Sequence, residues 1–525
     1  MNTYLLKKTD PVAQNKETYM KMFRKFTLCA ALLLFGAAAI AQNAYDALRF
    51  SEQYQEGTAR SVAMGNAFTA LGGDMGGITI NPASSAVYRY SEFVITPSLQ
   101  GISNSVNYLG NASSHNNTKF GISNLGFVGS YNTGRRDAGL VNWSFGLVVN
   151  KMNNFTNGMR ARGTTNASSW LSALAAQTNG NNAPSMDLND SNDPFFYSNA
   201  SWNSILAWNN TLLDTLPGTR DQYIAATENL DGYDISVGGD LDQIYRNKAV
   251  GNVTEATINF GGNFSNKLFV GVNLGIRSIT YKYDEKYSEK ALNSNNFNSG
   301  FESFSTAYSY RATGSGINLK AGVIYVPVDW LRLGAGISTP TWTYIDETWE
   351  NEMGGKFNDG YSQNILSPIG TYNYSLTSPF RWNVGAALRL GVLGVVSADF
   401  ESVDYSKAIL DDNEDIKDLL GTQNIVRVGA EVNVTPVFAV RAGYQHYSSP
   451  YSDAKASDNK NIGSFGIGYI TECGASDFFV DLTWQQLLNK GKENFSLYAD
   501  TEIPAPVGTN KVNNWKVLLS LGFRF

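Results

Sequence analysis

The sequence is poor in the side chains that most often carry catalysis and metal binding. Its 525 residues include two cysteines and two histidines. Cys29 falls in a segment that we expect to be removed, so Cys473 would stand alone, which excludes an internal disulfide and a cysteine-based zinc cluster. His115 and His446 are far apart in the chain, and "QHYSS" around the second shows residue types without a catalytic arrangement. We therefore predict a protein that is not an enzyme and that holds no cofactor and no metal.

Charged residues and long apolar runs are also scarce. Charged residues make up 16% of the chain and the net charge is −6, so we expect no basic surface that would attract nucleic acid. One apolar run, about residues 26–40, follows Arg24 and Lys25 and ends in Ala-Ile-Ala. That order is typical of a secretory signal peptide, and the run is too short to span a membrane comfortably as a helix. We expect residues 1–41 to comprise a signal peptide and a possible extension that precedes it in the sequence. The mature chain is expected to begin near Gln42.

Aromatic residues and glycine are abundant, and they fall into a regular alternation. At the C-terminus one set alternates with another: Trp515, Val517, Leu519, Leu521, Phe523 and Phe525 against Lys516, Ser520, Gly522 and Arg524. Period two places the two sets on opposite faces of a strand. A soluble core fits poorly, because arginines and glycines recur on one face while the other stays apolar. A barrel instead turns the apolar face to lipid and the polar face to its lumen, and a terminal Phe is similar to the C-terminal signal of bacterial outer-membrane barrels.

Fourteen segments share this alternation. They are 91–100, 120–131, 140–151, 256–265, 268–281, 312–326, 330–343, 377–390, 394–405, 424–434, 437–447, 462–471, 477–488 and 513–525. An even number of strands, with short turns alternating with long loops, is expected of a single-chain bacterial barrel. The sequence therefore predicts an all-β fold over 91–525, a 14-stranded antiparallel transmembrane β-barrel with both termini on the periplasmic side.

Seven of the connections between these segments are long. They are 101–119, 152–255, 282–311, 344–376, 406–423, 448–461 and 489–512, which we predict to be extracellular loops. The longest, 152–255, has apolar residues at near-helical spacing behind Ser168 and Ser201, so short helices are predicted there. A calcium site at Asp411, Asp412 and Glu414 stays open beside the simpler interpretation, a solvated acidic loop.

Residues 42–90 precede the first strand and show no barrel alternation. The stretch GTARSVAMGNAFTALGGDMGGITINPASSAVY, 57–88, resembles the N-terminal hatch of the FadL/TodX family of outer-membrane transporters of hydrophobic compounds. A phosphate-binding loop is the weaker interpretation of its glycines, because no strand precedes them and no Gly-Lys-Ser/Thr follows. The resemblance, which covers essentially the whole mature chain, implies a partly helical hatch that plugs the barrel.

The same resemblance implies the function and the residues that serve it. A monomer in the outer membrane of a Gram-negative bacterium would carry hydrophobic compounds, above all long-chain fatty acids. Ligand would be captured at an outer groove, bind in the lumen, and leave sideways past the hatch beside a kinked third strand. The hatch and gating residues would be Asn81, Pro82, Ala83, Gly76 and Gly77, and Gly146 would be the candidate for the lateral opening.

Two further sets of residues are candidates for ligand contact, each with a simpler alternative. In the lumen, a carboxylate head group could meet Arg277, Arg332, Arg381, Arg389, Arg427 or Arg441. These arginines could equally pair with Asp399, Glu401 and Glu431 inside the lumen, which is the favoured interpretation for any single arginine. Candidates for the outer groove are Trp202, Leu206, Leu212 and Leu213, for which plain packing of the loop is an equal alternative.

The expected partners are hydrophobic small molecules, such as fatty acids, lipids or detergent, and the lipid of the outer membrane. An alternative function is that of a barrel of this family serving as an outer-membrane shuttle or secretion component that binds exported proteins. A diffusion porin is disfavoured, because the hatch would plug the lumen.

Overall fold

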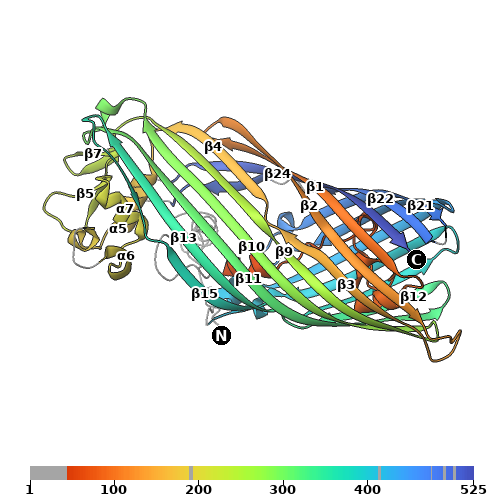
Figure 1. Ribbon diagram of the computed structural model, residues 1–525. Helices are drawn as coiled ribbons and strands as arrows, with labels where there is room; N and C mark the ends of the chain where they lie inside the picture. Colours follow the sequence, from red (N-terminus) through yellow and green to blue (C-terminus); the bar gives the residue numbers. More distant parts are fainter. Residues whose placement is uncertain (1–43, 189–192, 412–414, 475, 489–491, 500–503) are drawn as a thin grey trace, which may run out of the picture.

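The chain folds into a closed barrel. The computed structural model describes residues 44–188, 193–411, 415–474, 476–488, 492–499 and 504–525, and the predicted signal peptide lies outside them. One antiparallel sheet closes on itself because the first wall strand pairs with the last, with Phe93 opposite Phe523 and Asn107 opposite Thr509. Figure 1 shows these strands winding around a common axis. Closure pairs the first and last strands, so the sheet has no open end, as a bilayer requires.

Fourteen strands form the wall in chain order, and three of them are built from two pieces. They are β1 (Glu92–Tyr108), β2 (Asn111–Asn132), β3 with β4 (Leu140–Asn154 and Asn157–Thr165), β9 (Leu241–Phe264), β10 (Leu268–Ala291), β11 (Phe301–Val328), β12 with β13 (Leu331–Ser338 and Trp342–Phe357), β15 with β16 (Gly370–Thr377 and Arg381–Arg389), β17 (Gly394–Asp404), β19 (Thr422–Thr435), β20 (Phe438–Tyr447), β21 (Lys460–Cys473), β22 (Ser476–Leu487) and β24 (Val507–Arg524). Each predicted segment lies in one of these strands. The predicted fold class is confirmed.

The outer surface of the wall carries an apolar belt, the band of exposed apolar side chains that alternate with buried polar ones. On β10, Val272 and Ile276 are exposed while Asn273 and Arg277 are 2% exposed. Aromatic side chains mark the edges of the belt, among them Tyr131, Trp143 and Trp330 toward the short turns and Trp342 and Tyr344 toward the other end. This is the outer face of a barrel that lipid covers. Among the described residues, no helix has the length and apolar character that crossing a membrane would need.

The strands run well past the belt, which corrects several predicted loops. The segments 101–119, 282–311 and 344–376 are mostly strand, and β1 and β2 join in a tight turn at Leu109 and Gly110. Their outward side chains are mostly polar, with exceptions such as Leu366 and Tyr372, because most of this part of the wall lies beyond the belt. A search for apolar alternation ends at the belt and therefore misses these extensions.

The predicted loop 152–255 is partly wall and partly a folded cap, by which we mean the described residues 168–188 and 193–240. The ends of the segment belong to β4 and β9. The cap contains α5 (Trp170–Thr178), η2 (Ala183–Met186), α6 (Pro194–Tyr197), α7 (Trp202–Asn209), and the hairpins β5–β6 (Leu213–Thr215, Tyr223–Ala225) and β7–β8 (Glu228–Asp231, Asp234–Val237). Ser201 caps α7 as predicted, whereas α5 is capped by Ser169 and not by Ser168. Figure 1 shows the cap at the end of the barrel away from the C-terminus.

The remaining described elements are short. They are β14 (Ser362–Leu366), β18 (Ile409–Leu410), β23 (Lys492–Ser496), α8 (Asp415–Leu419), η3 (Ser294–Asn296), η4 (Tyr405–Lys407) and η5 (Ala456–Asp458). Asp412 and Glu414, which belong to the calcium alternative, lie outside the described residues.

Candidate functional site: the lumen and the N-terminal segment inside it

Residues 44–90, which we call the hatch, lie inside the barrel (Figure 1). The hatch contains α2 (Ala44–Ser51), α3 (Ala59–Ala63), α4 (Met75–Ile78) and η1 (Pro82–Val87). It follows the inner wall around the lumen: α3 packs on β20–β22 and β24, and η1 packs on β11, β10, β9 and β3. Between them, the backbone N–H of Thr69 donates to Asp399 of β17 at 2.8 Å. The segment therefore touches most of the wall before the chain enters β1.

Glycines on the inward face of the wall make room for the hatch. A side chain at Gly429 or Gly443 would overlap the backbone around Met64 and Gly65, and one at Gly271 would overlap Pro82. The same holds for Gly334, against the backbone of Thr69. The small residues on the polar face of the predicted strands are thus docking positions, where only glycine permits so close an approach.

Asn81 ties the Asn-Pro-Ala tripeptide to the rest of the hatch and to the wall. Its Oδ1 accepts from the Ala83 N–H at 3.0 Å and so caps η1, while its Nδ2 donates to Thr69 O at 2.6 Å and to Val323 O of β11 at 3.1 Å. Pro82 occupies the first position of η1, where its fixed φ is favourable. Asn259 of β9 donates to Pro82 O at 3.0 Å.

The glycines of the same stretch serve the packing of the hatch. Gly72 and Gly73 adopt φ of 65° and 68°, which only glycine reaches without strain. Gly76 donates its N–H to Asp74, the N-cap of α4, and a side chain there would overlap Ser61. Gly77 lies against Phe68 and Ser84. These contacts place all five predicted hatch residues in the packed interior, and their part in gating stays a prediction.

Asn81→Ala is expected to loosen the hatch without preventing barrel assembly. The change leaves the buried carbonyl of Thr69 without its Asn81 donor, at about 1–3 kcal/mol for an unpaired buried group. It also removes the bond to the part-buried carbonyl of Val323 and the cap of η1. Heat-modifiable migration on a gel should show a folded barrel with a lower melting temperature, and uptake of hydrophobic probes should fall. Unchanged melting and unchanged uptake would mean that Asn81 only fills space.

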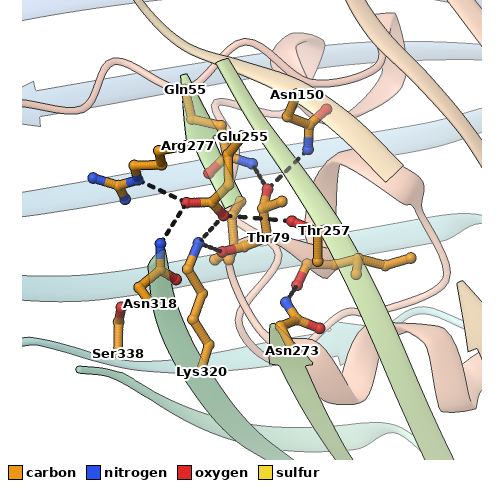
Figure 2. Close-up of polar contacts among 12 residues, drawn as sticks. Gln55, Thr79, Asn150, Glu255, Thr257, Asn273, Arg277, Asn318, Lys320 and Ser338 are labelled. Carbon is orange, nitrogen blue, oxygen red and sulfur yellow. Dashed lines mark hydrogen bonds and ion pairs between the residues drawn. The ribbon is translucent and has the colours of Figure 1, made fainter. Parts of the chain in front are cut away.

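A buried ion-pair cluster holds the middle of the hatch to the wall (Figure 2). Glu255 of β9 is 0% exposed and accepts from Arg277 Nε at 2.8 Å, Lys320 Nζ at 2.5 Å and Asn318 Nδ2 at 3.0 Å. Lys320 also donates to the carbonyl of Thr79 in the hatch at 3.2 Å. Figure 2 shows Asn150 and Gln55 reaching the Thr79 hydroxyl from other directions. One carboxylate thus pairs with two cations, of which Lys320 also bonds to the hatch.

The other predicted lumen arginines are mostly paired as well. Arg381 and Arg427 share Glu401, at 3.0 and 2.8 Å. Arg441 bridges Glu431 and Asp481, at 2.6 and 2.5 Å. The structure therefore shows the pairing alternative for these arginines and for Arg277, and Arg60 of the hatch joins Glu431 at 2.8 Å.

Two arginines differ from this pattern. Arg332 donates to the carbonyl of Leu71 in the hatch. Arg389 is exposed near the short-turn end of β16, away from the buried pairs. The lumen arginines thus do not converge on one free head-group clamp in the described part of the chain.

A cavity of about 510 Å³ lies beside the first helix of the hatch, between it and the inner wall. Hatch residues on one side include Leu48, Arg49, Tyr54 and Gln55. The opposite side is formed by β1, the β3–β4 junction, β20–β22 and β24. Its size suits a small hydrophobic molecule or part of a longer one.

The wall splits between β2 and β3 beside this cavity. β2 and β3 pair only between Asn124, opposite Asn150, and Asn132, opposite Asn142. N-terminal to Asn124, β2 pairs with β1 alone among the described strands. Register shifts mark both sides of the split, one opposite Thr96 and Pro97 in the β1–β2 ladder and one between Lys151 and Asn153 of β3. Outward Phe120 and Ile122 of β2 are exposed here, so the split lies at the edge of the apolar belt.

The hatch closes this split with residues 54–56, which we call the latch. The N–H groups of Tyr54 and Glu56 donate to the carbonyls of Met152 and Lys151 of β3, both at 2.8 Å. The Glu56 carboxylate is 3% exposed, accepts from Ser123 Oγ of β2 at 2.7 Å and pairs with Lys151 and with Lys516 of β24. The latch therefore takes the place of β2 along the free part of β3 and joins both sides of the split.

Gly146, the predicted candidate for the lateral opening, lies away from this split, and its part in any opening stays a prediction. It pairs with Val128 of β2 and Asn259 of β9 in an unbroken part of both ladders. The third strand is irregular at Lys151–Asn153 instead, where the break comes from a bulge and not from a glycine. The structure thus places the irregularity in the predicted strand but several residues later.

The predicted groove residues of the cap are buried. Trp202, Leu206, Leu212 and Leu213 are 0–3% exposed in one apolar cluster with Trp170. That cluster is held to the wall by Glu289 of β10, which accepts from Ser169 Oγ at 2.5 Å and from the Trp170 N–H at 2.8 Å. The structure thus shows loop packing for these four residues.

The two histidines do not come together. His446 points outward on β20, where its Nδ1 lies 2.7 Å from Asn461 Oδ1. His115 lies on β2, in a stretch predicted to be loop, beside Gly158 of β4. Within the described residues, no group of three His, Cys, Asp or Glu side chains is arranged to hold a metal ion.

The stability of the barrel depends on pH through Glu347, which lies in the lumen on the cap side of the belt. It lies on β13 beyond the belt, next to exposed Asp346, and accepts from the hydroxyls of Tyr310 and Tyr374. Burial raises the pKa of Glu347 to about 7, although the two tyrosine hydroxyls oppose the shift. The folded state therefore keeps its proton at pH values where the unfolded state has lost it, so the stabilisation is complete below about pH 4.5 and declines as the pH rises to about 7.

We expect the melting temperature to fall between pH 4.5 and 7 and then to level off with respect to this group. The shift corresponds to at most about 3 kcal/mol. Glu347→Gln should reduce the slope of the profile in that range by the contribution of this one carboxyl group, whereas Glu302→Gln, at an exposed surface ion pair with Lys356, should leave the slope unchanged. Equal slopes in the wild type and in Glu347→Gln would contradict this role.

Comparison with known proteins shows likeness in structure. No family model and no curated protein sequence matches the chain. A FadL homologue of Pseudomonas aeruginosa superposes with a TM-score of 0.50 at 12% identity, over 90% of this chain and 99% of that one. The toluene transporters TodX of P. putida and TbuX of Ralstonia pickettii each give 0.49, at 13% and 14% identity, with the same coverage. The predicted resemblance is confirmed in the fold: the chain has the architecture of the FadL-type barrels, fourteen strands closed around an N-terminal hatch.

Proposed function

We propose that the chain is an outer-membrane channel that carries hydrophobic small molecules without chemical conversion. The observation that carries the proposal is the cavity of about 510 Å³ that lies beside the latch, next to a split in the wall at the edge of the apolar belt. An apolar solute gains nothing from a water-filled pore, whereas a sideways exit delivers it to lipid. Tyr54 and Gln55 belong both to the cavity lining and to the latch, so a bound ligand contacts the segment that must move.

The class of compound follows from the likenesses. The resemblance in the hatch sequence favours long-chain fatty acids, and two of the similar solved structures are toluene transporters. Long-chain fatty acids and toluene are both largely apolar, so a plugged barrel with a lateral exit would suit the transport of either. Release would require residues 54–56 to leave the edge of β3, with Glu56 parting from Lys151 and Lys516.

The test is uptake by cells that carry or lack the chain. Labelled toluene and labelled oleate should enter more slowly when the gene is deleted, and re-expression should restore the rate. Proteoliposomes with the purified barrel should take up the same probes. If uptake is intact on deletion but an exported protein fails to reach the cell surface, the chain is instead a shuttle for that protein.

A further inference from the structure

The cavity beside the latch has two chemically different linings. One is apolar and comprises Leu48, Ile102, Ile462, Leu487 and Val512. The other is a group of side-chain amides and comprises Gln100, Asn154, Gln445, Gln485 and Asn514. Gln100, Asn154 and Asn514 bond to one another, through Gln100 Nε2 to Asn514 Oδ1 at 3.2 Å and Asn154 Nδ2 to Gln100 Oε1 at 2.6 Å. Their remaining donors and acceptors, with those of Gln445 and Gln485, match hydroxyl and amide groups better than they match a bare hydrocarbon.

Each cation in the same lining already has a carboxylate partner, although Lys516 shares Glu56 with Lys151. Lys516 pairs with Glu56, and Arg49 pairs with Asp46 of its own helix. Lys460 lies 4.0 Å from Glu52 and 4.5 Å from the ring centre of Tyr54. These are the three Lys and Arg side chains of the described lining, so a carboxylate ligand would compete with an existing carboxylate at each of them.

Two buried polar atoms of the lining find no acceptor within the described chain. Gln445 is 2% exposed and its Oε1 accepts from the Tyr447 hydroxyl at 2.7 Å, which leaves its Nε2 without a protein partner. Thr156 is 3% exposed, and its Oγ1 also has no hydrogen-bond partner in the described protein. Both belong to the cavity lining. Both atoms are covered in the described rotamers, so a ligand oxygen accepts from them only after the side chain turns toward the cavity, and it would then recover the free energy that an unpaired buried donor costs.

We propose that the cavity binds neutral amphiphiles, molecules that join an apolar ring or chain to several hydroxyl or amide groups, in preference to hydrocarbons and to carboxylates. The apolar part lies against Leu48 and Ile102, and the polar part meets Gln445 and its neighbouring amides. This inference rests on the proposed function, since it names the class of compound for the same cavity.

Three soluble probes with one common ring test the preference. Phenyl β-glucoside, benzoate and toluene are bound to the purified full-length barrel in lipid nanodiscs, and equilibrium dialysis gives each dissociation constant. Phenyl β-glucoside should bind about tenfold more tightly than benzoate or toluene, the equivalent of one or two additional hydrogen bonds. Gln445→Leu should remove most of that advantage and leave toluene binding within about twofold.

Controls separate the site from the fold and from the transport proposal. Thr156→Val, a second and milder change, should weaken phenyl β-glucoside binding in the same direction if Gln445→Leu fails to assemble, and Gln363→Leu on the exposed β14 should change nothing. Tightest binding of benzoate or toluene, or no effect of either cavity variant, overturns the inference, yet the proposed function stands if proteoliposomes still take up toluene. If no probe binds and none enters, both fail.

Discussion

Glu255→Ala is expected to free the middle of the hatch and to destabilise the barrel by about 3–5 kcal/mol. The carboxylate is the only partner that brings Arg277 and Lys320 together in the described structure, and both cations are almost fully buried. Removing it leaves two uncompensated buried charges, and Lys320 loses the contact that aims it at the Thr79 carbonyl. Thermal unfolding in detergent should shift downward, and amide exchange around Thr79 should accelerate.

Two controls decide whether burial of charge causes the effect. Glu302→Ala breaks an ion pair with Lys356 on the exposed surface, and it should cost less than about 1 kcal/mol. Replacing the cluster together, as Glu255→Leu, Arg277→Met and Lys320→Met, should recover most of the loss because no buried charge remains. A Glu255→Ala barrel as stable as the wild type would show that the cluster does not hold the hatch.

Glu56→Ala is expected to open the latch while the wall stays closed elsewhere. The change leaves Lys151 and Lys516 inside the lumen without the carboxylate that they share. It also removes the hydrogen bond that Ser123 donates to that carboxylate. Attraction to these two lysines outweighs burial and keeps the pKa of Glu56 at about 2, so the ion pairs persist across the physiological pH range. A local loss of about 3–4 kcal/mol corresponds to an about 10²- to 10³-fold larger population of the open latch.

Hydrogen exchange of the Tyr54 and Glu56 amides measures that opening directly, because both donate to β3 only while the latch is closed. Exchange at Ala59, whose N–H donates to Ser520 on another part of the wall, is the internal reference and should change little. Equal exchange of the latch amides in the wild type and in Glu56→Ala would mean that backbone pairing alone closes the split.

The wall could be predicted from the sequence because lipid and lumen impose opposite chemistry on alternate residues. Phe523 and Arg524 are neighbours in the chain yet face different surroundings, and that contrast recurs in every predicted strand. Where the wall leaves the membrane, lipid no longer imposes the contrast. Segments such as 101–119 therefore read as loops although backbone pairing continues through them.

The closure of the lumen could not be predicted in the same way. Glu56 and Lys516 are 460 positions apart, and nothing local to either shows that they meet. The split depends on a bulge near Met152, and bulges of this kind leave no clear trace in composition. The tripeptide at Asn81 could be recognised because its proline and its capping residue are neighbours in the sequence. The contact of Asn81 with Val323, which is distant in the sequence, could not be predicted. For Trp202 and its neighbours, apolar helical spacing fits a groove and a core equally well, and only tertiary packing distinguishes them.

Ligand-dependent labelling at Ser123 tests most directly the claim that hydrophobic molecules leave through the latch. Ser123 is 1% exposed beneath Glu56, so Ser123→Cys, in a background where exposed Cys473 is replaced by serine, reports the opening of the split. Ser144→Cys, buried where η1 meets β3, reports any general loosening of the hatch. With toluene present, maleimide should label Ser123→Cys at least about tenfold faster while Ser144→Cys stays protected, a change of about 1.4 kcal/mol in the opening equilibrium. Toluene uptake at the normal rate with Ser123→Cys still protected would contradict the account.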